Sequence, residues 1–310
     1  MTTNHLRTGL LLAAMTALIL VVGQLVGGRQ GMIVALVLAA GMNFASYWYS
    51  DKIVLGMYRA RPVTAAQAPE LYALTEALSR RAGLPMPRLY LIPDPTPNAF
   101  ATGRNPEHAV VAVTEGLVRL MDREEIAGVL AHELAHVRNR DILVGSIAAT
   151  LAGAIMMLAS MARWSALFGG HRNDNNGGGL GGLGLILMSV IAPLAAMVIQ
   201  MAISRSREYL ADRTGAAISG SSEGLARALE KLGAHARGSR PMAANAATAH
   251  MFIVNPLSGG SLASLFSTHP PLAERIARLR GHDTQTAPPS APQGQTMARS
   301  GRDFWDRFSR

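Results

Sequence analysis

The sequence predicts an α-helical multi-pass membrane protein with a mainly α, α+β domain on the cytoplasmic side of the membrane. Three observations point to this fold class. Hydrophobic residues make up 49% of the 310 residues and charged residues only 16%, which is too apolar for an ordinary soluble protein. Four long apolar runs contain no Asp, Glu, Lys, Arg or His. The segments between and after these runs carry most of the charge and show mixed helix and strand patterns.

The four apolar runs each approach the length of about 20 residues that a helix needs to cross a bilayer; they cover residues 9–27, 31–49, 142–162 and 180–203. The first two are separated by only three residues and predict a helical hairpin over residues 1–50. A cleavable signal peptide is disfavoured, because the first run is longer than the apolar segment of a signal and the second follows at once. The last two runs predict a second hairpin over residues 142–203. Their lack of ionisable residues disfavours a transporter or pump.

The basic residues define the expected orientation. Of the 29 Lys and Arg residues, 25 follow the second and fourth runs, and the cytoplasmic flanks of membrane helices are enriched in basic residues. Both termini and residues 51–141 are therefore expected in the cytoplasm, with four spans in the bilayer. The net charge of +9 then reflects topology and not nucleic-acid binding. The absence of cysteine excludes a disulfide scaffold and a thiolate zinc site.

The two cytoplasmic segments, 51–141 and 204–280, show the patterns of a small α+β domain. Helices are predicted from about residue 70 to Gly83 and, after the fourth run, over 204–217, 222–236 and 271–279. Asp122 and Glu125 form a capping box that begins a further helix ending near Arg138. Alternating segments predict a small antiparallel sheet with strands at 88–92, 98–102 and 108–113. Residues 281–310 begin with a stretch poor in large apolar side chains and are predicted to be a disordered tail.

The most informative motif lies in the helix that this capping box begins: His132, Glu133 and His136 follow the pattern His-Glu-x-x-His. Residues four apart share a helix face, so both imidazoles can bind one Zn²⁺ ion. Glu133 can then take a proton from a water molecule at the open position of the metal. Two surface histidines on a solvated helix are the simpler alternative. The capped, amphipathic helix outside the apolar runs disfavours it.

A catalytic zinc ion usually has a third protein ligand, for which the candidates are His108, Glu208, His235, His250 and His269. Glu208 is favoured because it follows the fourth run just as His136 precedes the third. If these two runs are antiparallel neighbours, their cytoplasmic ends emerge side by side. Asp212 lies one turn further on the same face, where it can accept the N–H of a ligating histidine. The alternative is that both acidic residues are exposed and pair with nearby arginines.

Four motifs together resemble the bacterial HtpX membrane metalloprotease family, relatives of the CAAX prenyl endopeptidases. They are the stretches 98–103 (NAFATG), 132–136 (HELAH), 208–212 (EYLAD) and 267–271 (STHPP). The resemblance covers about residues 1–280. It implies a gluzincin-type zinc metalloprotease of the bacterial inner membrane, active in quality control and the stress response. It also implies that the substrates are unfolded or misassembled membrane proteins cut on their cytoplasmic parts, with other membrane quality-control proteases as candidate partners beside the lipid bilayer.

The same resemblance implies roles for individual residues. His132, His136 and Glu208 match the zinc ligands of the family, and Glu133 matches the catalytic carboxylate. The remaining matches are Asn98 and Ala99 in the strand that holds the substrate, and catalytic His269 with Arg275 near the reacting carbonyl.

Three other interpretations use the same residues. A prenyl-protein processing endopeptidase is a close alternative, because the same site can serve it. A site-2-type intramembrane protease also contains His-Glu-x-x-His, but Arg123, Glu124 and Arg138 flank the motif here and disfavour burial in the bilayer. A zinc-stabilised scaffold without activity would need only the ligands, and the presence of Glu133 argues against it.

Overall fold

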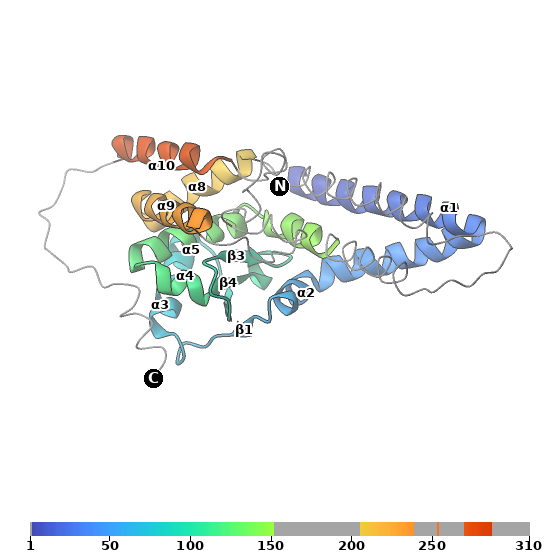
Figure 1. Ribbon diagram of the computed structural model, residues 1–310, viewed down its shortest axis with the longest axis horizontal. Helices are drawn as coiled ribbons and strands as arrows, with labels where there is room; N and C mark the ends of the chain where they lie inside the picture. Colours follow the sequence, from blue (N-terminus) through green and yellow to red (C-terminus); the bar gives the residue numbers. More distant parts are fainter. Residues whose placement is uncertain (1, 152–204, 239–252, 254–269, 287–310) are drawn as a thin grey trace, which may run out of the picture.

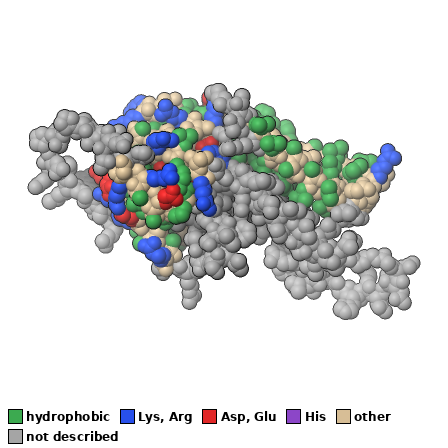
Figure 2. Space-filling view, turned by 90° about the horizontal axis from the view of Figure 1, so that it is seen from above, with side chains coloured by type: hydrophobic (Ala, Val, Ile, Leu, Met, Phe, Trp, Pro, Cys, Tyr) green, Lys and Arg blue, Asp and Glu red, His purple; other side chains and the backbone are tan. Residues whose placement is uncertain are grey.

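The computed structural model describes residues 2–151, 205–238, 253 and 270–286 of the chain. A long helical arm, α1 (Thr2–Trp48), projects from a globular part that contains the sheet and most of the other helices (Figure 1). Hydrophobic side chains cover most of this arm, whereas acidic and most basic side chains gather on the globular part (Figure 2). The separation matches the division into membrane and cytoplasmic segments that the sequence predicts.

The arm is a hairpin of two helical halves. The helix is interrupted at Gly27 and Gly28, and Gly28 has a φ of 56°, a conformation that glycine adopts readily. Across the hairpin, Asn43 Nδ2 donates a hydrogen bond of 2.9 Å to Thr16 Oγ1. A Cβ atom on Gly31 would overlap the carbonyl oxygen of Gly23, so glycine permits the close approach of the two halves. The two halves of α1 thus lie side by side, and the crossing of the membrane by this hairpin stays a prediction.

Within the described residues, one helix is long and apolar enough to cross a membrane, Gly27–Trp48, and Thr8–Gln24 and Ile142–Leu151 are shorter apolar helices. The helix Ile142–Leu151 is the beginning of the third apolar run. Its buried side chains pack against Leu11 and Met15 of α1. The rest of the third run and the whole of the fourth lie outside the described residues.

The sheet has four strands in the order β1-β2-β4-β3; they are β1 (Arg61–Pro62), β2 (Arg88–Ile92), β3 (Ala99–Thr102) and β4 (Val110–Thr114). The predicted strands are present, but the prediction of a wholly antiparallel sheet is wrong. β3 and β4 form an antiparallel pair, and β4 then lies parallel to β2. All five residues of β4 are buried, which favours a central position between β2 and β3. β3 is left at the edge of the sheet.

The described helices after the arm are α2 (Ser50–Met57), α3 (Pro69–Ala82), α4 (Glu115–Leu120), α5 (Arg123–Arg138), α8 (Arg205–Ser219), α9 (Glu223–Gly238) and α10 (Leu272–Thr286), with a 3₁₀ turn, η1 (Pro106–His108). The capping box is confirmed, because Asp122 Oδ1 accepts from Glu125 N and Asp122 N donates to Glu125 Oε2, both at 2.9 Å. α10 extends past Gly281, where the sequence predicts the tail to begin. Residues 287–310 of that tail lie outside the described residues.

α5 is the central helix of the globular part and contacts β3, α3, α8 and α9 (Figure 1). Two glycines bring α5 and the start of α9 into backbone contact. A Cβ on Gly128 would lie 2.8 Å from Leu225 Cα, and a Cβ on Gly224 would overlap the carbonyl oxygen of Glu124. Gly215 of α8 likewise permits a close approach to α5, because a Cβ there would lie 2.9 Å from His132 N.

We expect Gly128→Ala to destabilise the protein by about 1–3 kcal/mol, because the added methyl group must push α9 away from α5. The midpoint of thermal unfolding in detergent measures the effect. Gly56→Ala is the matched control, since Gly56 is exposed and no described atom lies within 4 Å of its added Cβ. Equal midpoints for the two variants would contradict the close helix contact.

Candidate active site

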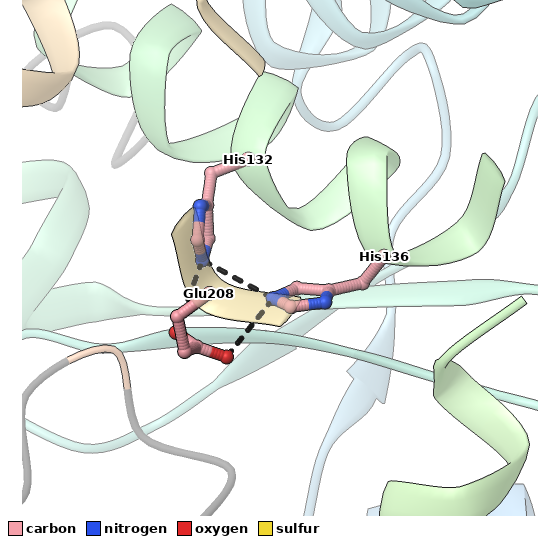
Figure 3. A group of neighbouring side chains, drawn as sticks. All are labelled: His132, His136 and Glu208. Atoms are coloured by element: carbon pink, nitrogen blue, oxygen red, sulfur yellow. Dashed lines mark hydrogen bonds and ion pairs between the residues drawn. The ribbon is translucent and has the colours of Figure 1, made fainter. Parts of the chain in front are cut away.

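Three side chains from two helices converge, with their polar atoms directed at one another (Figure 3). His132 and His136 project from α5, and Glu208 projects from the first turn of α8. Their candidate ligand atoms all lie within 4.8 Å of one another. Within the described part of the chain, this is the only group of three or more such residues that could hold a metal ion.

The distances in this group fit a tetrahedral zinc ion. Two nitrogen ligands at zinc bond lengths of about 2.0–2.1 Å would be about 3.3 Å apart, and the Nε2 atoms of His132 and His136 are 3.2 Å apart. Glu208 Oε1 lies 3.6 Å from His136 Nε2, and Glu208 Oε2 lies 3.8 Å from His132 Nε2. The two nitrogens and the carboxylate are also the donor types that zinc prefers.

The electrostatic environment also favours a cation. Burial alone lowers the pKa of an imidazole, yet the hydrogen bond to Asp141 and the charge of Glu208 raise the pKa of His136 to about 9. The carboxylates around the site therefore stabilise positive charge between them. A divalent metal ion would supply that charge in place of the proton, since a ligating imidazole must be neutral.

An acidic residue contacts the ring nitrogen of His132 that does not face the other two ligands. Asp212 Oδ1 lies 3.0 Å from His132 Nδ1. A proton on Nδ1 leaves the lone pair of Nε2 facing the other two ligands. Asp212 is itself held by Arg275 of α10, whose Nε and Nη2 atoms donate to the two carboxylate oxygens at 2.9 and 2.7 Å. Burial raises the pKa of a carboxyl group, but the Arg275 charge dominates and lowers the pKa of Asp212 to about 2.

Arg275 is fully buried, with 0% exposure. Its Nη1 atom donates to the carbonyl oxygen of Ile253 at 3.2 Å and lies 3.7 Å from Glu208 Oε2. All three nitrogens of the guanidinium group are thus directed at Asp212, Ile253 or Glu208. The expectation that Arg275 supports the ligands stays a prediction that this geometry favours. Among the described residues, its nitrogen atoms contact protein groups, and none of these contacts places Arg275 beside the carbonyl group of a substrate.

The sequence analysis did not identify Asp141, which supports the second histidine. Asp141 Oδ2 lies 3.4 Å from His136 Nδ1, and the side chain of Asp141 is only 8% exposed. It is the residue just before the third apolar run, so the sequence shows it only as a charge at a membrane boundary. Its spacing of five residues from His136 carries no helical signal, because α5 has already ended.

Glu133 is buried beside the ligands and points to the sheet instead of to α8. Its Oε2 atom accepts a hydrogen bond of 2.8 Å from the backbone N–H of Ala101 in β3. Burial, which disfavours the carboxylate, raises the pKa of Glu133 to about 7. The charge of His136 acts in the opposite direction and only partly offsets burial. The role of Ala101 was not predicted from the sequence, since it contributes a backbone N–H that any residue except proline could supply.

The hydrogen-bond pattern of β3 leaves the backbone groups on one side of this strand outside the ladder with β4. Thr114 N donates to the carbonyl oxygen of Asn98, so Asn98 and Thr114 form a hydrogen-bonded pair of the antiparallel ladder. Pairs alternate along an antiparallel ladder, so the N–H and C=O groups of Ala99 and Ala101 face away from β4. They form the outer edge of the sheet among the described residues, where Ala99 is buried. Ala101 N–H on this edge is the group that Glu133 uses.

The other predicted site residues have mixed outcomes. Asn98 is buried and its side-chain oxygen accepts from Ile253 N at 3.3 Å, so this side chain binds the backbone of Ile253. His108 pairs with Asn105 and Arg104 and belongs to no metal group, and His235 likewise lies outside the ligand cluster. His250 and His269 lie outside the described residues.

Comparison with known proteins gives a consistent result. The profile of peptidase family M48 matches residues 65–283. The chain is 65% identical over 307 residues to a "Protease HtpX homolog" of Desulforapulum autotrophicum, covering 98% of this chain and 99% of that protein. It is 56% identical over 275 residues to the protein of the same name from Pyrococcus furiosus, covering 88% and 94%. Among solved structures, the crystal structure of S. mikatae Ste24p matches with a TM-score of 0.49 and 22% identity, over 90% of this chain and 66% of that chain.

These findings confirm the family that the four sequence motifs indicate. The family match covers most of the chain, including the three converging ligands and Glu133. The similarity to the HtpX homologs extends over nearly the full length of both chains. The chain therefore belongs to peptidase family M48 and is a metallopeptidase of the HtpX type.

Proposed function

We propose that this protein is a zinc-dependent endopeptidase of the bacterial inner membrane that cuts unfolded or misassembled membrane proteins at their cytoplasmic segments. The observation that carries the proposal is the convergence of His132, His136 and Glu208 within 4.8 Å, with Glu133 beside them. One zinc ion per chain would be held by these three ligands. A role in quality control and the stress response follows from the family resemblance.

In this proposal each residue of the site has a separate role in the reaction. A bound zinc ion would supply Lewis-acid activation of water and of the scissile carbonyl group. Glu133 Oε2 is held by Ala101 N–H at 2.8 Å, which leaves Oε1 to accept a proton from water. A carboxyl group with a pKa of about 7 can accept this proton near neutral pH and donate it to the leaving amine. Asp212 and Asp141 keep the two histidines oriented with Nε2 toward the metal position.

The proposed substrate site is the outer edge of β3, the side that does not pair with β4. An extended peptide can add to this edge as a further strand, through main-chain hydrogen bonds to Ala99 and to the carbonyl oxygen of Ala101, whose N–H binds Glu133. Such binding requires the segment to be unfolded but selects little for its side chains. This preference suits a protease that removes misassembled proteins of many sequences.

The membrane placement in this proposal has four spans, with both termini and the active site in the cytoplasm. The hairpin of α1 (Thr2–Trp48) corresponds to the first predicted hairpin, residues 1–50, and the second hairpin would occupy residues 142–203. The cytoplasmic segments 51–141 and 204–280 then build one active site from both sides of the second hairpin. The packing of Leu11 and Met15 against Ile147 and Leu151 supports adjacent first and third spans.

We expect Glu133→Gln to keep bound zinc but to lose peptidase activity by about 100-fold or more, because a general base is removed while the three ligands remain. Glu208→Ala should lose both zinc and activity. Metal content of the purified protein and cleavage of an unfolded membrane substrate measure the two effects. Glu115→Ala removes a half-buried carboxylate of α4 that pairs with Arg119, and it should change neither. Substantial activity in Glu133→Gln would show that another group is the base.

We expect His269→Ala to lower the turnover rate by about 100-fold or more, with zinc content and substrate affinity little changed. In this proposal the imidazole donates to the oxyanion, an interaction made mainly in the transition state. Steady-state kinetics together with metal analysis test it. An unchanged turnover rate would leave His269 a surface residue, and a loss of zinc would make it a competing ligand.

We expect single cysteines at Asn175 and Ser290 to react with a membrane-impermeant thiol reagent from opposite sides of the membrane. The wild-type chain has no cysteine, so each label reports one position. Intact spheroplasts expose the outer side and inverted vesicles the cytoplasmic side. Labelling of both positions from the same side would contradict the four-span topology.

A further inference from the structure

A cavity of about 550 Å³ lies where the arm joins the globular part. Its lining combines aromatic side chains from the end of α1 with basic side chains from three places in the chain. The aromatic residues are Tyr47, Trp48 and Tyr49, and the basic residues are Lys52, Arg88 and Arg104. This combination differs from the active site, which is lined by carboxylates and imidazoles.

The sheet topology explains why basic residues from distant positions meet here. β2 and β4 are parallel, so they begin at the same edge of the sheet, with Arg88 opposite Val110. Arg104 lies in the connection that leads from β3 back to this edge. Lys52 comes from the first turn of α2, which immediately follows α1.

The cavity carries excess positive charge. Arg88 Nη2 pairs with Asp51 Oδ2 at 2.7 Å. Lys52 and Arg104 have no carboxylate partner among the described residues and lie instead over aromatic rings, 5.3 Å from the centroid of Tyr49 and 4.8 Å from that of Trp48. The rings position the two cations without neutralising them, so two positive charges remain.

The aromatic wall continues into the apolar surface of α1. Trp48 and Tyr49 are 46% and 45% exposed, and Val37 and Leu38 further along the helix are 69% and 57% exposed. Tryptophan and tyrosine are enriched at the depth of lipid headgroups, and the helix Gly27–Trp48 is long enough to span a bilayer. A ligand that fits both parts has an anionic head and an apolar tail.

We propose that this cavity binds the phosphate headgroup of an anionic phospholipid in the cytoplasmic leaflet, with the acyl chains along the exposed side of α1. The proposal rests on the membrane placement of α1 proposed above, but not on peptidase activity. A soluble phosphate compound would use the same cations but would leave the aromatic and aliphatic surface exposed to water. Since Arg104 closely follows β3, a bound lipid would also attach the connection after the substrate strand to the membrane surface.

Trp48 itself can report the lipid. Replacing Trp164 and Trp305 by phenylalanine leaves Trp48 as the only tryptophan of the chain. This protein is reconstituted into vesicles of mixed phosphatidylglycerol and phosphatidylcholine in which one lipid or the other carries brominated acyl chains. We expect brominated phosphatidylglycerol to quench Trp48 at a clearly lower fraction of the total lipid than brominated phosphatidylcholine.

In the same background, Lys52→Ala with Arg104→Ala should lower the preference for phosphatidylglycerol by about 10-fold or more, because each basic residue near the surface contributes to anionic-lipid binding. The matched control is Arg80→Ala with Arg119→Ala, which removes two exposed cations, 71% and 50% accessible, from other helices. This control should keep the preference of the parent protein.

Three outcomes would overturn the proposal, and each has a distinct meaning. Equal quenching by the two lipids, or an unchanged preference in the Lys52 and Arg104 variant, would remove the headgroup site while leaving α1 in the bilayer. Loss of the preference on adding millimolar inorganic phosphate or glycerol phosphate would assign the cavity to a soluble anion. Absence of quenching by either lipid would place Trp48 outside the membrane surface and contradict the proposed topology itself.

Discussion

The candidate active site depends on one buried ion pair, the contact between Arg275 and Asp212. Two hydrogen bonds of 2.9 and 2.7 Å join α10 to α8, and Asp212 in turn lies 3.0 Å from His132 of α5. Breaking such a pair leaves an uncompensated buried charge and costs about 3–5 kcal/mol. The orientation of a ligand on α5 is therefore set by a residue of α10 that is far away in the sequence and not itself a ligand.

Because α5 lies between α8 and β3, one turn of this helix can present a metal ligand to α8 and the base to β3. Successive residues of a helix point about 100° apart, so His132 faces α8 while Glu133 faces β3. The close approach at Gly215 brings the α8 backbone against His132, and the α8 residue two turns earlier is Glu208. The ligands and the base are thus fixed by packing on two different faces of α5. A shift of either neighbour would separate the two functions.

Local patterns in the sequence predict the elements that depend on nearby residues. The capping box at Asp122 begins α5 as expected, and the Gly28 turn closes the first hairpin. Glu208 also follows from the sequence, because the topology of two membrane runs limits where their ends can meet. The parallel pairing of β2 with β4 and the role of Asp141 do not follow. Both depend on contacts across space that leave no periodic signal, and the N–H of Ala101 leaves no signal at all.

The location of Arg275 also distinguishes the carboxylates of the site. Asp212 has this cation at hydrogen-bond distance, and its pKa is lowered to about 2 despite burial, so it remains an anion and orients His132. Glu133 is buried without such a partner, and its pKa is raised to about 7. Two carboxyl groups with pKa values driven apart by their surroundings suit two different tasks. A guanidinium group placed against Glu133 instead would hold it as a weak base. The fold directs Arg275, the one fully buried arginine among the described residues, to the supporting carboxylate.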